Sequence, residues 1–222
     1  MESIDNRINY SRQAQFDALD TNKHKLNIIV GCGGIGFWLG IFLAMQGYYE
    51  FVLIDDQKIE PSNLNRLPVP PSWVGTYKTQ ALRKVIRSLR PVTSIVTFNG
   101  RILEEGFSYL NNLTNNYKQV WDCTDDARVQ KKLSAYCKEN NLPYRKLGYE
   151  AFKVGTYTDF NVWTTDDYAT GYRTSNACAV TSALAGIVGF MANILQVNED
   201  IDLDMKAILT KEVAHEEAQA TT

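Results

Sequence analysis

The sequence contains few of the residues from which metal sites and disulfide frameworks are built. Its 222 residues include four cysteines and two histidines. No C-x-x-C pair occurs and the cysteines lie far apart, which disfavours a structural zinc site and is typical of free thiols in a reducing compartment. His24 and His215 stand alone near the two ends, so we assign them no role. The four cysteines are Cys32, Cys123, Cys137 and Cys178.

The chain also has neither a large net charge nor a long apolar run. The formal net charge is −2, and no basic cluster is interleaved with aromatic residues, so we expect no nucleic-acid partner. The first residues carry acids and amides where a signal peptide needs an apolar run. The longest apolar stretch, Ala183–Leu195, is interrupted by two glycines and an asparagine and is too short to span a bilayer. We therefore expect a cytoplasmic protein with no membrane partner.

The overall composition is typical of one globular domain. Hydrophobic residues make up 45% and charged residues 22% of the chain, which is enough for a three-layer α/β core and leaves little for a second domain. We predict a single domain over 1–222. Its parts are an N-terminal arm or helix (1–25), a nucleotide-binding half (26–143), a segment with antiparallel strands, a crossover loop and a late helix (144–200), and a tail (201–222).

Apolar strands alternate with helical segments along the first half of the chain. Short buried strands are predicted at 26–30, 51–55, 94–98 and 120–122. Helices are predicted from the glycines after residue 30 to about 46, over 78–89, and to about 140 behind Asp125 and Asp126 as caps. Alternating strands at 144–147 and 154–163, a polar loop at 164–176 and an apolar helix to about 197 follow. This order predicts an α/β fold, namely a Rossmann-like, mostly parallel sheet with helices on both faces and an antiparallel C-terminal extension.

A glycine turn joins the first predicted strand to the first helix. Gly31, Gly33, Gly34 and Gly36 stand where a strand must turn sharply and where backbone can approach a phosphate. The helix that follows would offer free N–H groups and a partial positive charge to an anion. Asp55 closes the second strand, where a carboxylate can accept from ribose hydroxyls. NAD, FAD, SAM and ATP enzymes all use such a turn, so the nucleotide is not decided by it.

Four further segments narrow the choice of nucleotide and of enzyme family. They are Asn9–Gln13, Ser62-Asn63-Leu64-Asn65-Arg66, Val74-Gly75-Thr76-Tyr77-Lys78 and Asp122-Cys123-Thr124-Asp125-Asp126. With the glycine turn, and in this order, they resemble the motifs of the ThiF/MoeB/ubiquitin-activating (HesA/MoeB/ThiF) family of ATP-dependent adenylating enzymes. The resemblance runs over residues 9 to 126 and continues in an alanine- and glycine-rich late helix, so it covers most of the chain.

The resemblance implies an adenylyltransferase that uses ATP and Mg²⁺. Its partner would be a ubiquitin-like or sulfur-carrier protein of the β-grasp type with a glycine C-terminus, and the enzyme would be a homodimer. Adenylation places negative charge on phosphoryl oxygens, so the site needs cations rather than a protein nucleophile. The expected roles are Arg66 and Lys78 on the triphosphate, Asp55 on the ribose, Asn63 on a phosphate or carboxylate oxygen, Asp125 on Mg²⁺, and Arg12 reaching the triphosphate across the dimer interface. Ser62, Leu64, Asn65 and Asp126 complete the expected nucleotide contacts.

Cys178 is a candidate for a second step. It lies between the polar loop and the predicted N-terminus of the apolar helix, where a thiol pKa is lowered and a thiolate is favoured. Transfer of the activated carboxyl to this thiol is one reading, and a small packed residue in an alanine- and glycine-rich segment is the other.

The chain departs from the family pattern at several points. Leu67 stands where many members have Gln, Gln57 takes the place of a second acid, and Asp126 replaces Asn. The zinc-binding C-x-x-C pairs are missing, and we expect the terminal strands to be missing as well. The sequence thus predicts a minimal member of the family.

The sequence is compatible with three other functions. The enzyme could adenylate a peptide or another carboxylate without forming a thioester, or be a non-catalytic scaffold half of a heterodimeric activating enzyme. An NAD-linked oxidoreductase could use the same glycine turn. The joint presence of Arg66, Lys78 and Asp125 disfavours the last two, because neither a scaffold nor hydride transfer needs this set of charges.

Overall fold

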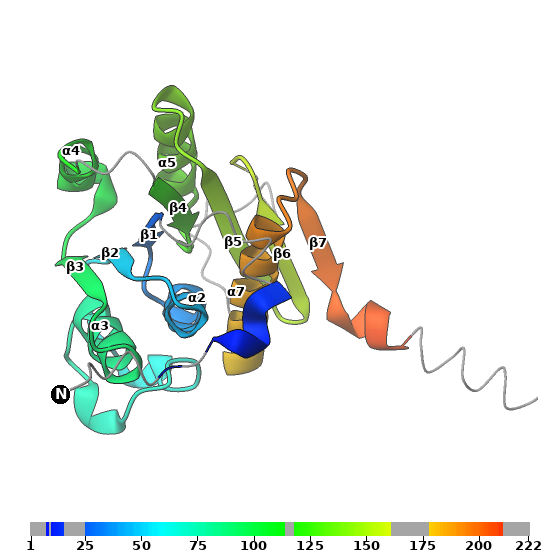
Figure 1. The fold of residues 1–222 in the computed structure, drawn as a ribbon, viewed down its shortest axis with the longest axis horizontal. Helices are drawn as coiled ribbons and strands as arrows, with labels where there is room; N and C mark the ends of the chain where they lie inside the picture. The colour runs from blue at the N-terminus through cyan, green and yellow to red at the C-terminus, as the bar shows by residue number, and fades with distance from the viewer. Residues whose placement is uncertain (1–7, 9, 16–24, 114–117, 161–177, 211–222) are drawn as a thin grey trace, which may run out of the picture.

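The computed structural model of the chain describes residues 8, 10–15, 25–113, 118–160 and 178–210. It contains a seven-stranded sheet with the strand order β3-β2-β1-β4-β5-β6-β7. Figure 1 shows this sheet between helices on both of its faces. The predicted fold class, a Rossmann-like and mostly parallel α/β sheet with an antiparallel extension, is confirmed.

Five strands form the parallel part of the sheet. They are β1 (Leu26–Val30), β2 (Glu50–Ile54), β3 (Ser94–Phe98), β4 (Lys118–Asp122) and β5 (Tyr144–Glu150). In the centre, Ile28 of β1 lies opposite Val52 of β2 on one side and Val120 of β4 on the other. All five residues of β1 are buried, because helices cover both faces of the sheet here. This is why β1 reads as an apolar run rather than an alternating one.

The last two strands are antiparallel. β6 (Lys153–Tyr157) pairs with β5, and β7 (Ile201–Asp204) pairs with β6. β6 ends at Tyr157, earlier than the predicted strand over 154–163, of which 161–163 lie outside the described residues. β7 corrects the expectation that 201–222 is only a tail without a terminal strand. Its four residues alternate apolar and acidic side chains, which is too short a pattern to indicate a strand without its neighbour β6.

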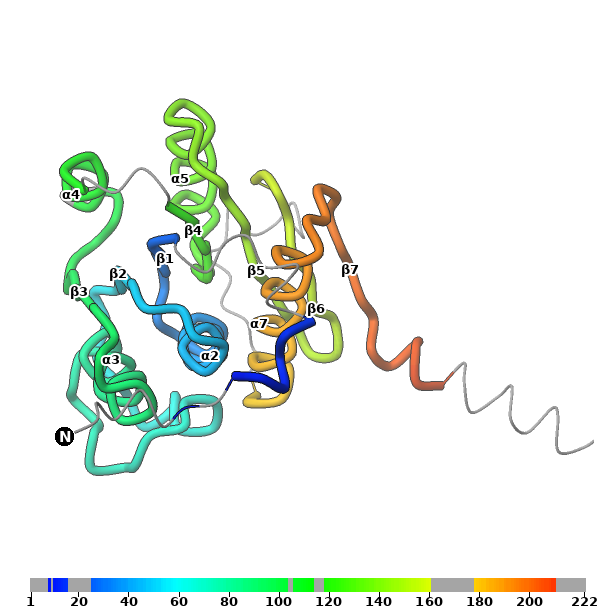
Figure 2. The backbone as a smooth tube through the Cα atoms, in the orientation of Figure 1, coloured from blue at the N-terminus to red at the C-terminus, as the bar shows by residue number. Residues whose placement is uncertain are grey.

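Three longer helices cover one face and two helices cover the other (Figures 1 and 2). The first group is α2 (Gly34–Gln46), α3 (Lys78–Leu89) and α7 (Ala179–Ile194), and the second is α4 (Phe107–Asn111) and α5 (Ala127–Glu139). A π-helical turn at Ile102–Gly106 leads into α4, and neither was predicted. Short 3-10 helices are η2 (Ser11–Gln13), η3 (Pro61–Asn63) and η4 (Pro71–Trp73). Of the described helices, none is long and apolar enough to cross a membrane.

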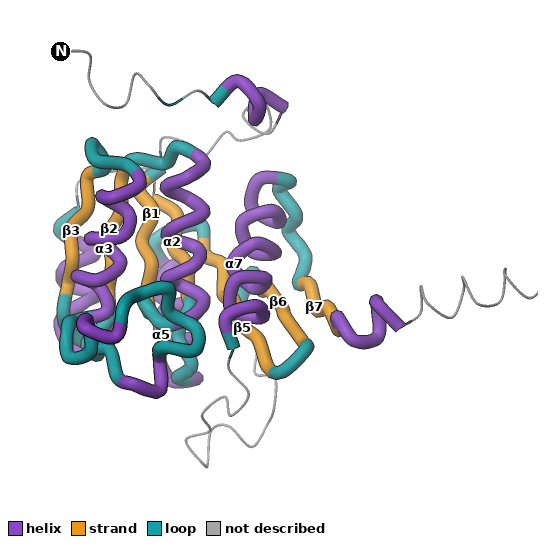
Figure 3. Tube along the Cα trace, turned by 90° about the horizontal axis from the view of Figure 1, so that it is seen from below, coloured by secondary structure: helices purple, strands orange, loops and turns teal. Residues whose placement is uncertain are grey.

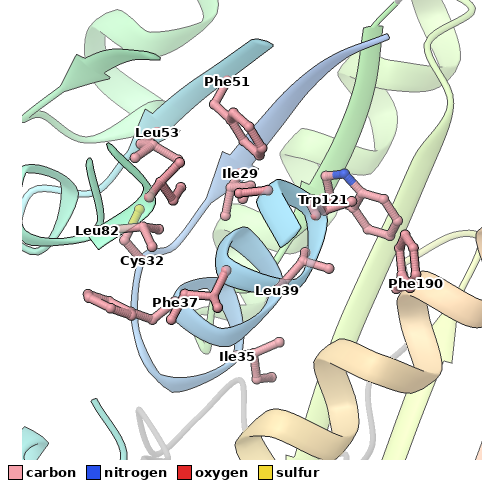
Figure 4. Packing of buried hydrophobic residues seen from close by; sticks show 14 of the residues in the cluster. Ile29, Cys32, Ile35, Phe37, Leu39, Phe51, Leu53, Leu82, Trp121 and Phe190 are labelled. Carbon is pink, nitrogen blue, oxygen red and sulfur yellow. The ribbon is translucent and has the colours of Figure 1, made fainter. Parts of the chain in front are cut away.

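The larger core lies between the sheet and the helices α2, α3 and α7. α2 is apolar around its whole circumference, because α3 and α7 flank it while the sheet lies beneath it. Figure 4 shows its side chains Phe37 and Leu39 in this core, together with Trp121 of β4 and Phe190 of α7. The indole Nε1 of Trp121 donates to Oδ1 of the buried Asn27 at 2.9 Å. This bond satisfies two polar groups in an otherwise apolar layer.

The chain leaves β1 and β4 in opposite directions across the sheet. After β1 it continues to β2 and β3 on one side, and after β4 it continues to β5 on the other. The loops that follow these two neighbouring strands therefore diverge at the carboxyl ends of the strands. In open α/β sheets ligands bind at this switch point. The glycine turn follows β1 and the Asp122–Asp126 segment follows β4, so both predicted motifs meet there.

Candidate active site

The glycine turn (Gly31–Gly36) is shaped by close approaches of backbone to backbone. Gly31 has φ +88° and donates its N–H to the Ile54 carbonyl at 2.8 Å. A Cβ on Gly31 would lie 2.8 Å from the carbonyl oxygen of Cys123, and a Cβ on Gly36 would lie 2.0 Å from the carbonyl oxygen of Gly31. Neither position tolerates a side chain. The turn thus holds β1, β2, α2 and the loop after β4 together.

Gly33 differs from its neighbours because a side chain there would meet no atom of the described residues. It is the N-cap of α2, no side chain caps this helix, and a Cβ built on Gly33 meets nothing within 4 Å among the described residues. The N–H groups in the first turn of a helix have no partner within the helix. Uncovered backbone at the start of a 13-residue helix is a suitable place for a phosphate.

Gly34 brings α7 and Arg66 to the same turn. A Cβ on Gly34 would lie 2.5 Å from the Ser182 hydroxyl oxygen and 3.1 Å from Cδ of Arg66. Ser182 donates its hydroxyl to the Cys178 carbonyl at 2.7 Å. The first turn of α7 is thereby held against the first turn of α2, which the sequence did not predict.

Asp55 accepts two backbone hydrogen bonds directly after β2. Its Oδ2 accepts from the Cys32 N–H and its Oδ1 from the Gln57 N–H, each at 2.7 Å. Burial raises the pKa of this carboxyl group, while the nearby Lys78 acts in the opposite direction. Each carboxylate oxygen has a second lone pair, so Asp55 can still accept from a ribose hydroxyl.

Lys78 is a buried cation beside Asp55. It is the first residue of α3, only 6% of its surface is exposed, and its Nζ donates to Oε1 of Gln57 at 2.5 Å. Gln57 is one of the positions where the chain departs from the family pattern. Its amide oxygen is a neutral acceptor for the ammonium, which leaves the positive charge of Lys78 without a paired carboxylate in hydrogen-bond range among the described residues.

The Ser62–Arg66 segment forms a scaffold for one guanidinium group. Nη1 of Arg66 donates to the Ser62 carbonyl at 2.9 Å and to Oδ1 of Asn65 at 3.0 Å. The Trp38 indole of α2 donates to the Arg66 carbonyl at 3.0 Å. Arg66 is half-buried and is thus fixed in side chain and backbone.

Two other members of this segment have structural partners. Asn63 is buried, and its Oδ1 accepts from the Glu60 N–H at 3.1 Å, which caps the 3-10 helix η3. Leu64 packs against the larger core. The predicted contact of Asn63 with a phosphate or carboxylate oxygen would use its amide nitrogen, because only the N–H groups of an amide can donate to such an oxygen.

The segment after β4 contains three acids with different environments. Asp122 is fully buried and accepts from the Thr124 N–H and hydroxyl and from the Tyr144 hydroxyl, at 2.7–3.0 Å. Burial raises the pKa of this carboxyl group. Asp126 is the N-cap of α5 and accepts from the Arg128 N–H at 2.9 Å. Only Asp126 caps this helix, which corrects the prediction that both Asp125 and Asp126 do so.

Asp125 is exposed in the loop between β4 and α5. Its carboxylate makes no hydrogen bond or ion pair with any described residue, whereas Asp126 also pairs with the Arg128 guanidinium at 2.7 Å. The described part of the chain contains no group of three or more His, Cys, Asp or Glu that could hold a metal ion by itself. A metal at Asp125 would therefore need ligands from a bound molecule.

Cys178 is the N-cap of α7 and is exposed. Its sulfur lies 3.3 Å from the Thr181 hydroxyl oxygen, and this hydrogen bond lowers the pKa of the thiol. The other three cysteines are also free, and burial raises their pKa values. The polar loop over 164–176, which precedes Cys178, lies outside the described residues.

Tyr149 links these parts of the site and was not predicted. It lies near the end of β5 and is half-buried against the larger core. Burial raises the pKa of its phenol, Arg66 lowers it, and the charges of Cys178 and Asp125 raise it. One side chain is thus in electrostatic range of three predicted site residues. No sequence signal marks it, because a tyrosine in an alternating strand is ordinary.

Arg12 does not join this group. It is exposed in η2, between two residues that contact the C-terminal end of α2. Gln13 donates to the Gln46 carbonyl at 2.9 Å, and the Tyr10 ring lies against Gly47. The glycine turn lies at the other end of α2, about 20 Å away for 13 residues at 1.5 Å each. Arg12 therefore cannot reach the glycine turn of its own protomer.

The chain is similar to three curated proteins along different stretches. A tRNA threonylcarbamoyladenosine dehydratase of Haemophilus influenzae is 32% identical over 122 residues, covering 54% of this chain and 46% of the relative. Ubiquitin-like modifier-activating enzyme 5 of Drosophila mojavensis is 28% identical, covering 62% and 37%. A molybdopterin-synthase adenylyltransferase of H. influenzae is 26% identical over 215 residues, covering 92% and 86%. The chain thus spans less than half the length of the first two relatives.

A solved structure and a family profile cover most of the chain. The crystal structure of E. coli MccB with AMPCPP and MccA superposes with a TM-score of 0.69 at 19% identity, covering 88% of this chain and 71% of that one. This likeness shows the fold. The sequence profile of the ThiF family matches residues 9–210. A glycine turn, two cations and a free carboxylate at the switch point are thus found in a chain that belongs to the ThiF family.

Proposed function

We propose that this protein is an ATP-dependent adenylyltransferase. It activates the C-terminal carboxylate of a ubiquitin-like or sulfur-carrier protein that ends in glycine. One observation carries the proposal: Arg66 after η3, Lys78 at the start of α3 and Asp125 in the loop after β4 come from separate parts of the chain to the side of the sheet where the glycine turn leaves Gly33 uncovered. Relatives named molybdopterin-synthase adenylyltransferase and ubiquitin-like modifier-activating enzyme support it.

The residues suit each part of ATP. Asp55 accepts from the ribose, and the first turn of α2 with Gly33 receives the phosphates. Lys78 and Arg66 provide positive charge beside them, Lys as a point charge and Arg with its remaining N–H donors. The carboxylate of the carrier attacks the α-phosphorus, one O–P bond forms, and the bond to the leaving pyrophosphate breaks. The cations stabilise the charge on the phosphoryl oxygens in the transition state.

Asp125 is the residue that would hold Mg²⁺. Its exposed carboxylate has no hydrogen-bond or ion-pair partner among the described residues. Mg²⁺ binds through one or two carboxylates with substrate phosphates and waters rather than in an all-protein cage. A single free carboxylate beside a phosphate site fits this requirement. When bound, Mg²⁺ would neutralise charge on the phosphates.

Cys178 would carry out the second step. Its lowered pKa favours the thiolate, and the contacts between the first turns of α7 and α2 keep it near the glycine turn. Attack on the acyl-adenylate would form a C–S bond and release AMP. The four free thiols also support a reducing, cytoplasmic setting.

The exposed face of α7 supports a homodimer. Val180, Ile187 and Leu195 are 75%, 41% and 54% exposed, and Leu184 and Met191 are half-buried between them. Their spacing places them on one side of a helix that has no charged residue. An apolar stripe of this kind marks an interface. A second copy of the chain is the occupant we propose, since Arg12 needs the nucleotide site of another copy.

Intact-mass spectrometry with ATP–pyrophosphate exchange tests the proposal. Purified protein is incubated with Mg-ATP and β-grasp proteins ending in glycine, without reductant. We expect an AMP adduct on a carrier and a joined species that is lost in Cys178→Ala, whose pyrophosphate exchange stays within twofold of wild type. Full product formation by Cys178→Ala would refute the thioester step. ATP binding without exchange or adduct on any partner would contradict the proposal and favour a scaffold or a different carboxylate.

A further inference from the structure

Arg90 ties the N-terminal segment to the ends of two helices. It follows α3 directly, and its guanidinium Nε donates to the Tyr10 hydroxyl at 2.9 Å. Its Nη2 donates to the Met45 carbonyl in the last turn of α2 at 2.9 Å, and its Nη1 to the Leu89 carbonyl at 2.8 Å. The guanidinium carbon also lies 5.7 Å from the centroid of the Tyr10 ring. One side chain thus connects α2, α3 and the N-terminal segment.

A second attachment lies on the other side of Arg12. Gln13 donates its side-chain N–H to the Gln46 carbonyl at 2.9 Å, and its backbone N–H to the Tyr10 carbonyl at 3.0 Å. Arg12 lies between Tyr10 and Gln13 with its own side chain exposed. Its backbone is therefore held on both sides while its side chain is exposed.

This attachment lies at one end of α2, whereas the glycine turn of the same protomer lies at the other end. Figure 3 shows the N-terminal helical segment beyond one end of α2, and the Gln46 and Met45 contacts identify that end as the C-terminal one. The glycine turn is about 20 Å away along the helix. An arginine that acts on phosphates from this position must act on those of another molecule.

We propose that Arg90 is a positioning residue that presents Arg12 to the nucleotide site of a second copy of the chain. The proposal rests on the proposed function and on Arg12 acting there. Arg suits this task because its planar fork donates to the Tyr10 hydroxyl and to two carbonyls in fixed directions, whereas a lysine ammonium has no such rigid fork. Without Arg90 the segment would lose the bond that fixes the Tyr10 hydroxyl, and Arg12 would reach the other site in a smaller fraction of molecules.

Mixed dimers distinguish positioning from a general loss of stability. We compare Arg12→Ala, Arg90→Ala, Arg90→Lys and Tyr10→Phe, with Arg87→Ala as a matched control on the exposed side of the same turn of α3. Tyr10→Phe removes the hydroxyl that accepts the Arg90 Nε bond and keeps the ring. Pyrophosphate exchange is measured for each protein alone and after subunit exchange with Lys78→Met, which has a damaged phosphate site but an intact N-terminal segment. Thermal melts show which variants are folded.

We expect Arg12→Ala and Arg90→Ala to lower kcat by at least roughly tenfold, Tyr10→Phe and Arg90→Lys by less, and Arg87→Ala by less than twofold. The double variant of Arg12 and Arg90 should be no slower than Arg12→Ala, because both changes remove one function. Mixing Arg90→Ala with Lys78→Met should restore activity, since the intact site receives Arg12 from its partner.

Three results would overturn the proposal, and each has a different meaning. The role of Arg90 alone is refuted if the pyrophosphate exchange of Arg90→Ala stays within twofold of wild type. It is also refuted if mixing with Lys78→Met restores the activity of Arg12→Ala but not that of Arg90→Ala. Arg12→Ala with full activity would refute action across the dimer while adenylation stands. Wild-type protein without pyrophosphate exchange would refute the proposed function itself.

Discussion

Gly33 and Gly36 allow the effect of a side chain on ATP binding to be measured separately from its effect on folding. The two glycines lie in the same turn, three residues apart. A Cβ on Gly36 would lie 2.0 Å from the carbonyl oxygen of Gly31, whereas a Cβ on Gly33 meets no described atom within 4 Å. The backbone of Gly33, with φ −77°, accepts an L-residue. We therefore expect Gly36→Ala to damage the fold and Gly33→Ala to damage ATP binding.

The magnitudes follow from these contacts. Gly36→Ala forces backbone apart in a packed core, which costs about 3 kcal/mol, and for a chain of this length lowers Tm by roughly 6–12 °C. Gly33→Ala changes an N-cap at a cost of no more than about 1 kcal/mol, or less than roughly 4 °C. A Cβ at position 33 would occupy the space in which a phosphate oxygen approaches the helix. Losing one charge-assisted hydrogen bond costs about 1.5–3 kcal/mol, which is roughly 10- to 150-fold in Kd for ATP.

Thermal unfolding and isothermal titration with Mg-ATP measure both quantities on the same samples. Gly36→Ala is the matched control, because it adds the same methyl group on the other side of the turn. The reasoning is refuted if Gly33→Ala binds ATP within twofold of wild type while remaining folded. It is also refuted if Gly36→Ala melts at the wild-type temperature, since the turn would then be far looser than the distances state.

Three further predictions concern the charged and nucleophilic groups. Lys78→Met and Arg66→Gln should each lower pyrophosphate exchange by about 10²–10³-fold through lost stabilisation of phosphoryl charge, and a change below fivefold in either would remove that residue from the site. The buried Asp122 has a raised pKa, so its stabilising contribution is full below its unfolded pKa and is lost as pH rises through the folded pKa. Urea unfolding should therefore show a gain in stability for Asp122→Asn at pH 7 that shrinks towards pH 4, and a gain that grows at low pH would contradict the sign. Thr181→Ala should shift the pH–rate profile of Cys178 alkylation by iodoacetamide to higher pH, because Thr181 is the largest cause of the lowered pKa, and an unchanged midpoint would assign that shift elsewhere.

The elements of the parallel sheet could be predicted because their signals are local. β1 is apolar at four of five positions since both of its faces are covered, and Gly31 and Gly36 after it stand where the turn leaves no room for a side chain. The short π-helical turn before α4 and the strand β7 could not be predicted. β7 is four residues long, and it is stabilised by pairing with β6 rather than by its own pattern.

Residue type and order along the chain were sufficient to predict the fold class and the glycine turn, which the structure confirms, and to predict Asp55, Arg66, Lys78 and Asp125 as site residues. Only the tertiary structure decided which of them share one environment. It brought Tyr149 and Ser182 into the site, gave the Lys78 ammonium a neutral Gln57 partner, and assigned the capping role to Asp126 alone. It also placed Arg12 at the far end of α2. The physical reason is that hydrogen bonds and burial join residues far apart in the chain, such as Trp121 and Asn27, which lie 94 positions apart, and no local pattern of side chains encodes such pairs.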